Sequence, residues 1–223
     1  MKKSKTVFLT GASRGIGKAI FKKLNKQGYK IITPSRKELD LSDPTSIKRL
    51  TEVNKKLKVD ILINNAGINL PQWIDELEDK NLEETLRINL ISPISLIRAF
   101  VPYMKQQKWG RIVNISSMFG VVARGKQTPY VASKHGLNGV TKTLALELGP
   151  YNILVNSVCP GFVKTDLVLR NPPEKLAALA KDVPLGRLAE PEEIAELVSY
   201  LISDKNSYIT GTNILIDGGY TCR

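Results

Sequence analysis

The feature that most constrains the fold of this chain is the alternation of short apolar runs with longer segments of helical periodicity. The runs Ile61–Ile63 and Ile153–Val155 contain only apolar residues, which indicates strands covered on both faces. Between such runs, apolar residues recur every three or four positions, as in Ile16–Leu24 and Pro191–Ile202. Strands that alternate with helices predict an α/β fold with a doubly wound parallel sheet. Ligands of such sheets bind outside the carboxyl ends of the strands.

The same pattern predicts the individual elements. Strands are expected at residues 7–10, 31–33, 61–63, 112–115, 153–155 and 214–216, with Glu38–Leu41 as a further, very short strand. Helices are expected from 16 towards 28, from about 42 onward, and over 81–105, 130–148 and 191–202. No repeat, linker or low-complexity tract interrupts the alternation, so residues 1–223 are interpreted as a single domain.

The composition disfavours several classes of function. The formal net charge of +12 suits an anionic partner, although scattered lysines are also typical of a solvated surface. We expect no nucleic-acid binding, because the basic residues form no stripe and aromatic residues are only 6% of the chain. With one histidine, His135, and only Cys159 and Cys222 as cysteines, neither a metal site nor a Ser-His-Asp triad is expected. No apolar run suits a signal peptide or a membrane span, so we expect a cytoplasmic protein.

A glycine-rich turn follows the first expected strand. The segment Thr10–Gly17 has the spacing G-x-x-x-G-x-G and precedes a helix, whose N-terminus favours the negative charge of a pyrophosphate. The second strand is followed by Arg36 and Lys37, where an NAD enzyme usually carries an acidic residue. Arg14 and Arg36 would instead suit a 2′-phosphate. The sequence therefore favours NADP(H) as cofactor, with NAD(H) as the alternative.

A tyrosine and a lysine one helical turn apart form the candidate catalytic pair. Tyr130 and Lys134 are four residues apart at the start of an expected helix, so their side chains share one face. A nearby ammonium is expected to lower the pKa of the phenol and fit it for proton transfer. Ser117 follows the strand that ends at residue 115 and is placed to hold a carbonyl oxygen, with Ser116 as its rival. Asn89 lies inside an expected helix, where it is polar surface or part of a proton relay.

Together these segments resemble the short-chain dehydrogenase/reductase family over essentially the whole chain. Asn64–Gly67 matches the family's sheet-centre motif, and Pro160–Thr165 matches the segment that passes the nicotinamide. The resemblance implies a Rossmann-type fold, and it selects Ser117 over Ser116, because the family places its serine thirteen residues before the tyrosine. The implied catalytic residues are Asn89, Ser117, Tyr130 and Lys134, with Ser117 and Tyr130 also binding substrate.

The resemblance also implies a role for each site residue. Tyr130 donates the proton, Lys134 lowers its pKa and holds the nicotinamide ribose, and Asn89 anchors the relay. One departure concerns the adenine side, because the stretch between Ile32 and Asp40 is too short for the helix that the family normally places there. This departure bears most on the NADP(H) preference. The implied cofactor contacts are Gly11, Ser13, Arg14, Ile16, Arg36, Asp40, Leu41, Asn65, Ala66, Gly67, Tyr130, Lys134, Pro160, Gly161, Val163 and Thr165.

The resemblance implies that the substrate is a small ketone or secondary alcohol. Val183–Arg187 and Tyr208–Thr212 are similar to segments of 3-oxoacyl-[acyl-carrier-protein] reductases, whose acidic carrier would suit Arg124 and Arg170. Sugar or polyol dehydrogenases, and a catalytically silent dinucleotide-binding regulator, remain as alternatives. The resemblance further implies a homotetramer formed through the helices at 81–105 and 130–148 and through residues 213–223. It also leads us to expect a substrate lid at about 162–184.

Overall fold

A six-stranded parallel sheet forms the centre of the computed structural model, which describes residues 4–53 and 57–222. The strand order is β2-β1-β3-β4-β5-β6, and every neighbouring pair is parallel. The order reverses direction between β1 and β3, which is the switch point where ligands of doubly wound sheets bind. The strands are β1 (Thr6–Leu9), β2 (Lys30–Ile32), β3 (Ile61–Asn64), β4 (Gly110–Ile115), β5 (Ile153–Pro160) and β6 (Asn213–Ile216).

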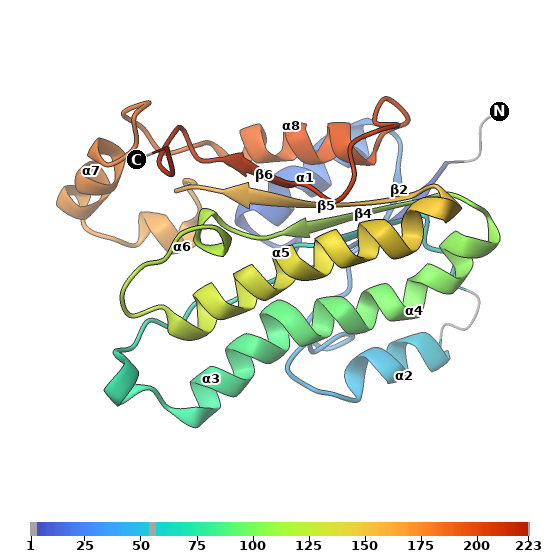
Figure 1. The fold of residues 1–223 in the computed structure, drawn as a ribbon, viewed down its shortest axis with the longest axis horizontal. Helices are drawn as coiled ribbons and strands as arrows, with labels where there is room; N and C mark the ends of the chain where they lie inside the picture. Colours follow the sequence, from blue (N-terminus) through green and yellow to red (C-terminus); the bar gives the residue numbers. More distant parts are fainter. Residues whose placement is uncertain (1–3, 54–56, 223) are drawn as a thin grey trace.

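Helices cover both faces of the sheet (Figure 1). One face carries α1 and α8, while α2, α4 and α5 cover the other. The short helices α6 and α7 lie beyond the carboxyl ends of the strands, close to the C-terminus of the chain. The helices are α1 (Gly15–Lys26), α2 (Ser46–Val53), α3 (Asp79–Leu86), α4 (Ser92–Gln106), α5 (Thr128–Leu148), α6 (Asp166–Leu169), α7 (Pro173–Lys181) and α8 (Pro191–Ile202).

Alternate residues of each strand enter opposite cores, as two-sided burial requires. In β1, Val7 and Leu9 pack into the cluster on the α1 and α8 side, whereas Phe8 packs into the cluster on the α2 and α4 side. The ring of Phe8 lies 4.9 Å from the ring of Phe100 on α4, centroid to centroid. The wholly apolar strands therefore reflect a sheet with no solvated face. Within the described residues, no helix has both the length and the apolarity to cross a membrane.

The expected seventh strand does not form in the part of the chain that the structure describes. Residues 38–41 lie in turns and irregular backbone, not in the sheet. The Asp40 and Ser42 amides donate to the side chains of Ser46 and Asp40, at 2.9 Å each, so they are used locally instead of in a strand ladder. The expectation of seven strands is therefore wrong by one, although the doubly wound architecture is confirmed.

The long helix expected over residues 81–105 is interrupted by a π-helical segment at Arg87–Ile91, between α3 and α4. Asn89 lies in this segment. A π turn widens the helix by one residue and is often found at functional sites. Asn89, a residue type that is unfavourable in the interior of an α-helix, thus lies where the helix departs from α geometry.

Candidate active site

Two adjoining cavities open at the carboxyl ends of the strands. The glycine-loop cavity has a volume of about 540 Å³, and the tyrosine cavity has a volume of about 460 Å³. Both are lined by Gly67 and Ile68, so the two form one continuous depression. Of the residues expected to bind cofactor, Gly11, Ser13, Arg36, Asp40, Leu41, Ala66 and Gly67 line the glycine-loop cavity. The tyrosine cavity is lined by Ile16, Asn65, Gly67, Ser117, Tyr130, Lys134, Pro160, Gly161, Val163 and Thr165.

The glycine loop is shaped by backbone geometry that side chains would obstruct. Gly11 has a φ of +68°, in the left-handed region that favours glycine. A Cβ atom on Gly17 would lie 2.1 Å from the carbonyl oxygen of Gly11 and 2.5 Å from Asn65 Nδ2. The loop can therefore turn tightly against α1 only with glycine at these positions. Its backbone amides are left at the helix N-terminus, where they suit a phosphate group.

Thr10 and Asn65 fix this loop against the end of β3. The Thr10 hydroxyl accepts the backbone N–H groups of Asn65 and Ala66, at 3.0 Å each. The Asn65 amide in turn donates to the carbonyl oxygens of Thr10 and Gly11, at 2.9 and 3.0 Å. Asn65 was expected as a cofactor contact, and in the structure its side chain also stabilises the loop through these two hydrogen bonds. Thr10 was missing from the sequence-based set, although its place after a strand marks the ligand-binding edge.

The residues expected to choose between the two dinucleotides are only partly brought together. Arg36 lines the glycine-loop cavity and pairs with Asp40 at 3.6 Å, while its side chain stays 77% exposed. The hydroxyl and backbone amide of Ser42 lower the pKa of Asp40, and Arg36 adds to this effect. Arg14 is exposed and does not line either cavity. Of the two arginines expected to bind a 2′-phosphate, only Arg36 lines a cavity, and the role of Arg14 stays a prediction.

Tyr130 and Ser117 meet in the tyrosine cavity. Ser117 lies two residues after the end of β4 and caps the short 3-10 helix Met118–Gly120, where its hydroxyl oxygen accepts the N–H of Phe119 at 3.1 Å. Burial raises the pKa of Tyr130, and a hydrogen bond with Ser117 partly opposes that rise. The direction is opposite to the one expected from sequence. The reason is that burial disfavours the charged phenolate more than the hydrogen bond with Ser117 favours it.

Lys134 lies beneath the tyrosine, within the fold. Its Nζ is 5.6 Å from the centre of the Tyr130 ring and donates to the carbonyl oxygen of Ile115 at 2.8 Å. Burial lowers the pKa of Lys134 to about 8 from its usual 10.5. In the described part of the chain, no carboxylate forms an ion pair with it. Ser116, the rival serine, instead donates its hydroxyl to the Lys134 carbonyl oxygen at 3.3 Å.

Asn89 joins the site through the backbone. Its amide accepts the N–H of Ile68 at 2.9 Å and donates to the Ile68 carbonyl oxygen at 2.8 Å. It also donates to Ser133 Oγ at 3.2 Å. A Cβ on Gly67 would lie 3.2 Å from Asn89 Oδ1 and 3.6 Å from Lys134 Nζ, so both groups face the same point. Asn89 does not itself line a cavity, and its part in a proton relay stays a prediction.

A polar stripe on α5, the helix that carries the candidate catalytic pair, bonds to the sheet and to the loop after β4, and the sequence analysis missed it. Asn138 donates to the Gly120 carbonyl oxygen, and Thr141 accepts from Asn114 on β4, both at 2.9 Å. These residues follow Lys134 by four and seven positions, so all three lie on one face of the helix. All are buried. The spacing of four and seven residues could have been detected in the sequence. It would have predicted a shared helix face, but not that this face packs against the sheet.

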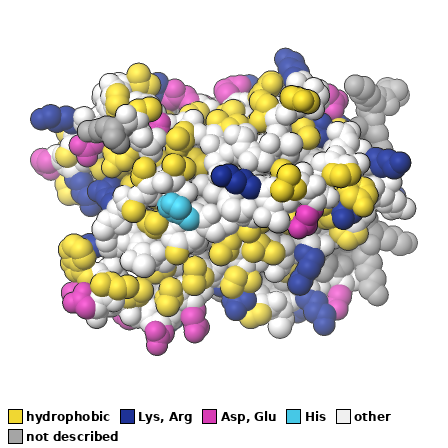
Figure 2. Space-filling model, in the orientation of Figure 1, with side chains coloured by type: hydrophobic (Ala, Val, Ile, Leu, Met, Phe, Trp, Pro, Cys, Tyr) yellow, Lys and Arg dark blue, Asp and Glu magenta, His cyan; other side chains and the backbone are white. Residues whose placement is uncertain are grey.

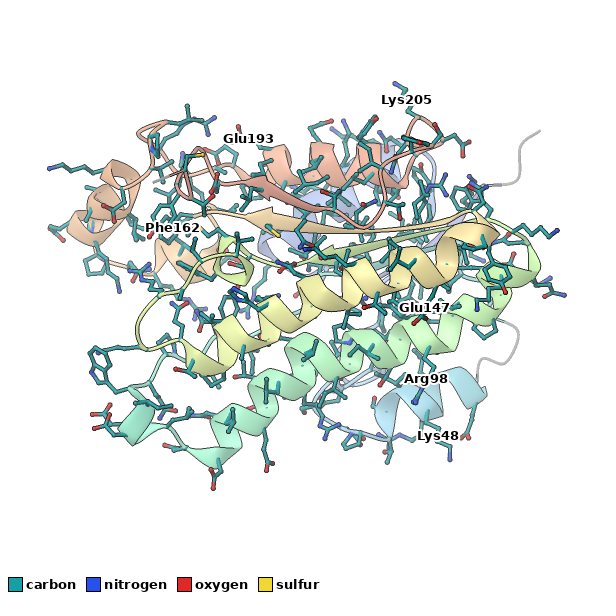
Figure 3. The ribbon with its side chains drawn as sticks, viewed as in Figure 1. Lys48, Arg98, Glu147, Phe162, Glu193 and Lys205 are labelled. Carbon is teal, nitrogen blue, oxygen red and sulfur yellow. The ribbon has the colours of Figure 1, made fainter. Side chains whose placement is uncertain are left out.

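The outer wall of the tyrosine cavity combines aromatic and basic side chains from distant parts of the chain. The rings of Phe119 and Phe162 are 6.3 Å apart, and Tyr220 packs edge-on against both, at 6.4 and 5.3 Å. Phe162 follows β5 and lies on the side of α6 and α7 (Figure 3). The guanidinium of Arg124 lies 6.0 Å from the Phe119 ring and 5.6 Å from the Phe162 ring. The expected lid supplies Val168, Asn171, Lys175 and Leu179 to the same cavity; its mobility stays a prediction.

Comparison with known proteins supports an oxidoreductase site. Residues 33–221 match the family model described as enoyl-(acyl carrier protein) reductase. A 3-oxoacyl-[acyl-carrier-protein] reductase of Thermotoga maritima is 36% identical, over 96% of this chain and 97% of that protein. A D-beta-hydroxybutyrate dehydrogenase of Rhizobium meliloti is 33% identical, over 99% and 100%. Among solved structures, a 4-hydroxyisoleucine dehydrogenase complexed with NADH is 34% identical with a TM-score of 0.91, over 99% and 100% of the two chains.

Proposed function

Because this chain belongs to the short-chain dehydrogenase/reductase family, most like its 3-oxoacyl-[acyl-carrier-protein] reductases, we propose that it is an NADP(H)-dependent enzyme in which Tyr130 transfers the proton. As an NAD(P)-dependent oxidoreductase, it interconverts a ketone and a secondary alcohol. The observation that carries the proposed mechanism is the convergence of Tyr130, Ser117 and Lys134 on one cavity that adjoins the glycine loop.

The cavities fit a dinucleotide. The glycine loop, the free amides of α1 and the depression shared at Gly67 provide a phosphate cradle and a continuous path to Tyr130. Arg36 and Asp40 would border the adenosine end, while Ile16, Pro160 and Val163 would border the nicotinamide. A nicotinamide dinucleotide held there would supply the hydride in reduction and accept it in oxidation.

The side chains around the reacting carbonyl divide the remaining tasks. The Ser117 oxygen accepts the Phe119 N–H, and its hydroxyl hydrogen-bonds Tyr130, so it would donate towards a carbonyl oxygen held between the two side chains. The raised pKa keeps Tyr130 protonated at neutral pH, so the phenol gives its proton to that oxygen as the carbonyl carbon gains hydride. The product is the secondary alcohol. In oxidation, the phenolate takes the hydroxyl proton back, and the Lys134 ammonium stabilises the phenolate.

Replacing Tyr130 by phenylalanine tests the mechanism. The variant keeps the ring but has no acidic proton, so kcat should fall by about 10²–10⁴-fold. Affinity for the dinucleotide, measured by fluorescence titration, should stay close to that of the wild type. Tyr151→Phe is the matched control, because Tyr151 lies in the 3-10 helix Gly149–Tyr151, lines no described cavity and is partly exposed. Undiminished turnover by Tyr130→Phe with a panel of ketones refutes the proposed role.

The preference for NADP(H) rests on Arg36, the basic group on the wall of the glycine-loop cavity, and on the lack of an acid at the end of β2. NAD(H) is the second candidate for two reasons. The solved 4-hydroxyisoleucine dehydrogenase is complexed with NADH, and the ion pair of Arg36 with Asp40 competes with the binding of a 2′-phosphate by Arg36. Arg36→Leu should weaken NADPH binding at least tenfold and leave NADH binding nearly unchanged. Tighter binding of NADH than of NADPH by the wild type contradicts the proposed preference.

Two substrate classes have specific support. A 3-oxoacyl thioester on an acidic carrier protein is favoured by the 36% identity to the reductase of Thermotoga maritima and by the net charge of +12. A small hydroxy acid is favoured by the D-beta-hydroxybutyrate and 4-hydroxyisoleucine dehydrogenases among the relatives. Comparison of kcat/KM for a 3-oxoacyl thioester and a free 3-oxo acid separates the two substrate classes.

We also propose a cytoplasmic location, which the unpaired Cys159 and Cys222 support.

We further propose that the protein associates with copies of itself through α4 and α5, as part of a homotetramer. Figure 2 shows hydrophobic side chains spread over this face, and an apolar groove lies between the two helices. Arg98 on α4 and Glu147 on α5 border the groove (Figure 3), so a two-fold axis would bring Arg98 of one protomer to Glu147 of its partner. The tetramer's second expected interface, at 213–223, includes Arg223, which lies outside the described residues.

Charge reversal tests this association by size-exclusion chromatography with light scattering. Arg98→Glu and Glu147→Arg should each weaken it, and the double variant should restore it. A wild-type protein that is monomeric at micromolar concentration, or a double variant that stays dissociated, refutes the proposed interface.

A further inference from the structure

The walls of the tyrosine cavity carry positive charge without any negative charge to balance it. Besides the buried Lys134, the cavity is lined by Arg124, Lys126 and Lys175, and none of its lining residues is an aspartate or a glutamate. Arg124 and Lys126 come from the loop before α5, and Lys175 comes from α7. Cations from two separate segments therefore converge on the space in front of Tyr130.

None of these three exposed cations is neutralised within the described chain. No ion pair joins Arg124, Lys126 or Lys175 to a carboxylate of residues 4–53 or 57–222. Elsewhere on this surface, basic side chains of the described part do find such partners, as Arg187 does with Glu193 at 2.7 Å. Acidic side chains are thus present elsewhere on the surface, but none lines this cavity.

Aromatic rings hold two of the cations in place. Arg124 lies over Phe119 and Phe162, which themselves line the cavity, and Lys126 Nζ lies 4.7 Å from the centre of the Trp73 ring. Stacking of this kind limits the side-chain freedom that a flexible cation would lose on binding an anion. It leaves the guanidinium hydrogens of Arg124 available for a planar oxyanion, which they match in a bidentate arrangement.

We propose that the ketone substrate carries an anionic group, which Arg124 binds with support from Lys126 and Lys175. This inference rests on the proposed function and adds the chemical class of its substrate. The anion is either the carboxylate of an oxo acid or the phosphate of a phosphopantetheine arm. Both groups carry several negatively charged oxygens that the same three cations can bind. Ser117 and Tyr130 hold the carbonyl at the inner end of the cavity, and Arg124 holds the charge at the outer end.

The decisive measurement compares matched substrates that differ only in charge. A 3-oxo acid is set against its methyl ester, and a 3-oxoacyl phosphopantetheine against the corresponding 3-oxoacyl pantetheine. In at least one pair, the wild type should favour the anionic member by roughly tenfold or more in kcat/KM, and the preference should weaken with added salt. Preference within the first pair identifies a carboxylate, and preference within the second identifies a phosphate. Equal kcat/KM within both pairs overturns the inference.

Variants assign the preference to the cavity. Arg124→Leu should raise KM for the anionic substrate by roughly ten- to a hundredfold with little change for its neutral counterpart. Arg124→Lys should retain part of the preference. Lys22→Leu is the control, because it removes one positive charge from the exposed surface of α1, away from both cavities. A loss in Arg124→Leu that is equal for charged and neutral substrates also overturns the inference, since it indicates a structural role.

A binding titration separates this inference from the proposed function. The 3-oxo acid and its methyl ester are titrated calorimetrically into the wild type and Arg124→Leu in the presence of oxidised dinucleotide, which has no hydride to give them. The 3-oxoacyl phosphopantetheine and the 3-oxoacyl pantetheine are titrated in the same way. Anion binding that disappears in Arg124→Leu, in a protein that turns over no ketone, supports the anion site while refuting the proposed reaction. Turnover of neutral ketones without any preference for anions supports the proposed reaction and refutes the anion site.

Discussion

Replacing Lys134 by methionine should stabilise the cofactor-free protein at neutral pH while abolishing its catalysis. Lys134 is only 4% exposed, and burial lowers its pKa from 10.5 to about 8. Below about pH 8 the folded protein therefore holds an ammonium that water would solvate far better. The difference between the two pKa values corresponds to about 3 kcal/mol at pH 7. Methionine fills a similar volume without charge but loses the hydrogen bond to the Ile115 carbonyl oxygen, at about 1 kcal/mol.

The net expectation is a gain of about 2 kcal/mol in the free energy of unfolding at pH 7. The gain depends on pH in a defined direction. Because the folded pKa lies below the unfolded one, the folded wild type binds fewer protons between about pH 8 and 10.5, and its stability rises with pH across that window. By pH 10 the penalty of Lys134 falls below about 1 kcal/mol, so the advantage of the variant should disappear.

Urea unfolding of both proteins at pH 7 and pH 10 measures this difference. Groups that titrate in both proteins cancel when the two stabilities are subtracted at each pH. Lys22→Met is the control, because Lys22 is exposed and its replacement should change neither value by more than about 0.5 kcal/mol. A variant that is less stable than the wild type at pH 7, or whose advantage is the same at pH 10, refutes the reasoning from burial.

Three further outcomes follow from the site. Gly17→Ala places a Cβ 2.1 Å from the carbonyl oxygen of Gly11, so dinucleotide affinity should fall at least tenfold and stability by about 1–3 kcal/mol; fluorescence titration and urea unfolding measure both, and wild-type affinity would contradict the proposed loop geometry. Asn89→Ala removes two hydrogen bonds to one backbone segment and should cost about 2–3 kcal/mol in urea unfolding, whereas an unchanged midpoint would show that these bonds are dispensable. The exposed Cys222 should react at once with a thiol reagent, while Cys159, whose pKa burial raises, should react only as the protein unfolds; rapid modification of both thiols argues against that burial.

Local and sequential patterns were sufficient for the architecture and for the candidate catalytic group. Apolar runs and helical periodicity depend on neighbouring residues alone, and they predicted the six strands that form and the bounds of α1, α5 and α8 to within two residues. They did not predict α6 or α7. The order of the motifs, from the glycine loop to Tyr130 and Lys134, identified the family before any geometry was known. The spacing of four between Tyr130 and Lys134 placed both on one face of α5 because a helix repeats every 3.6 residues.

The features that the sequence did not predict all depend on partners far along the chain. Residues 38–41 read as a strand, but a strand needs a neighbour to pair with, and these amides bond locally instead. The proximity of Lys134 suggested a lowered pKa for Tyr130, whereas burial by the assembled cavity raises it.

Arg124 gains its setting only because folding brings Phe119, Phe162 and Tyr220 together from three separate segments. Desolvation and convergence are properties of the packed molecule, and no local pattern of residues encodes them. The sequence by itself therefore determined the fold and indicated the group that we propose reacts, while the tertiary structure decided the burial of that group and the charge of the cavity around it.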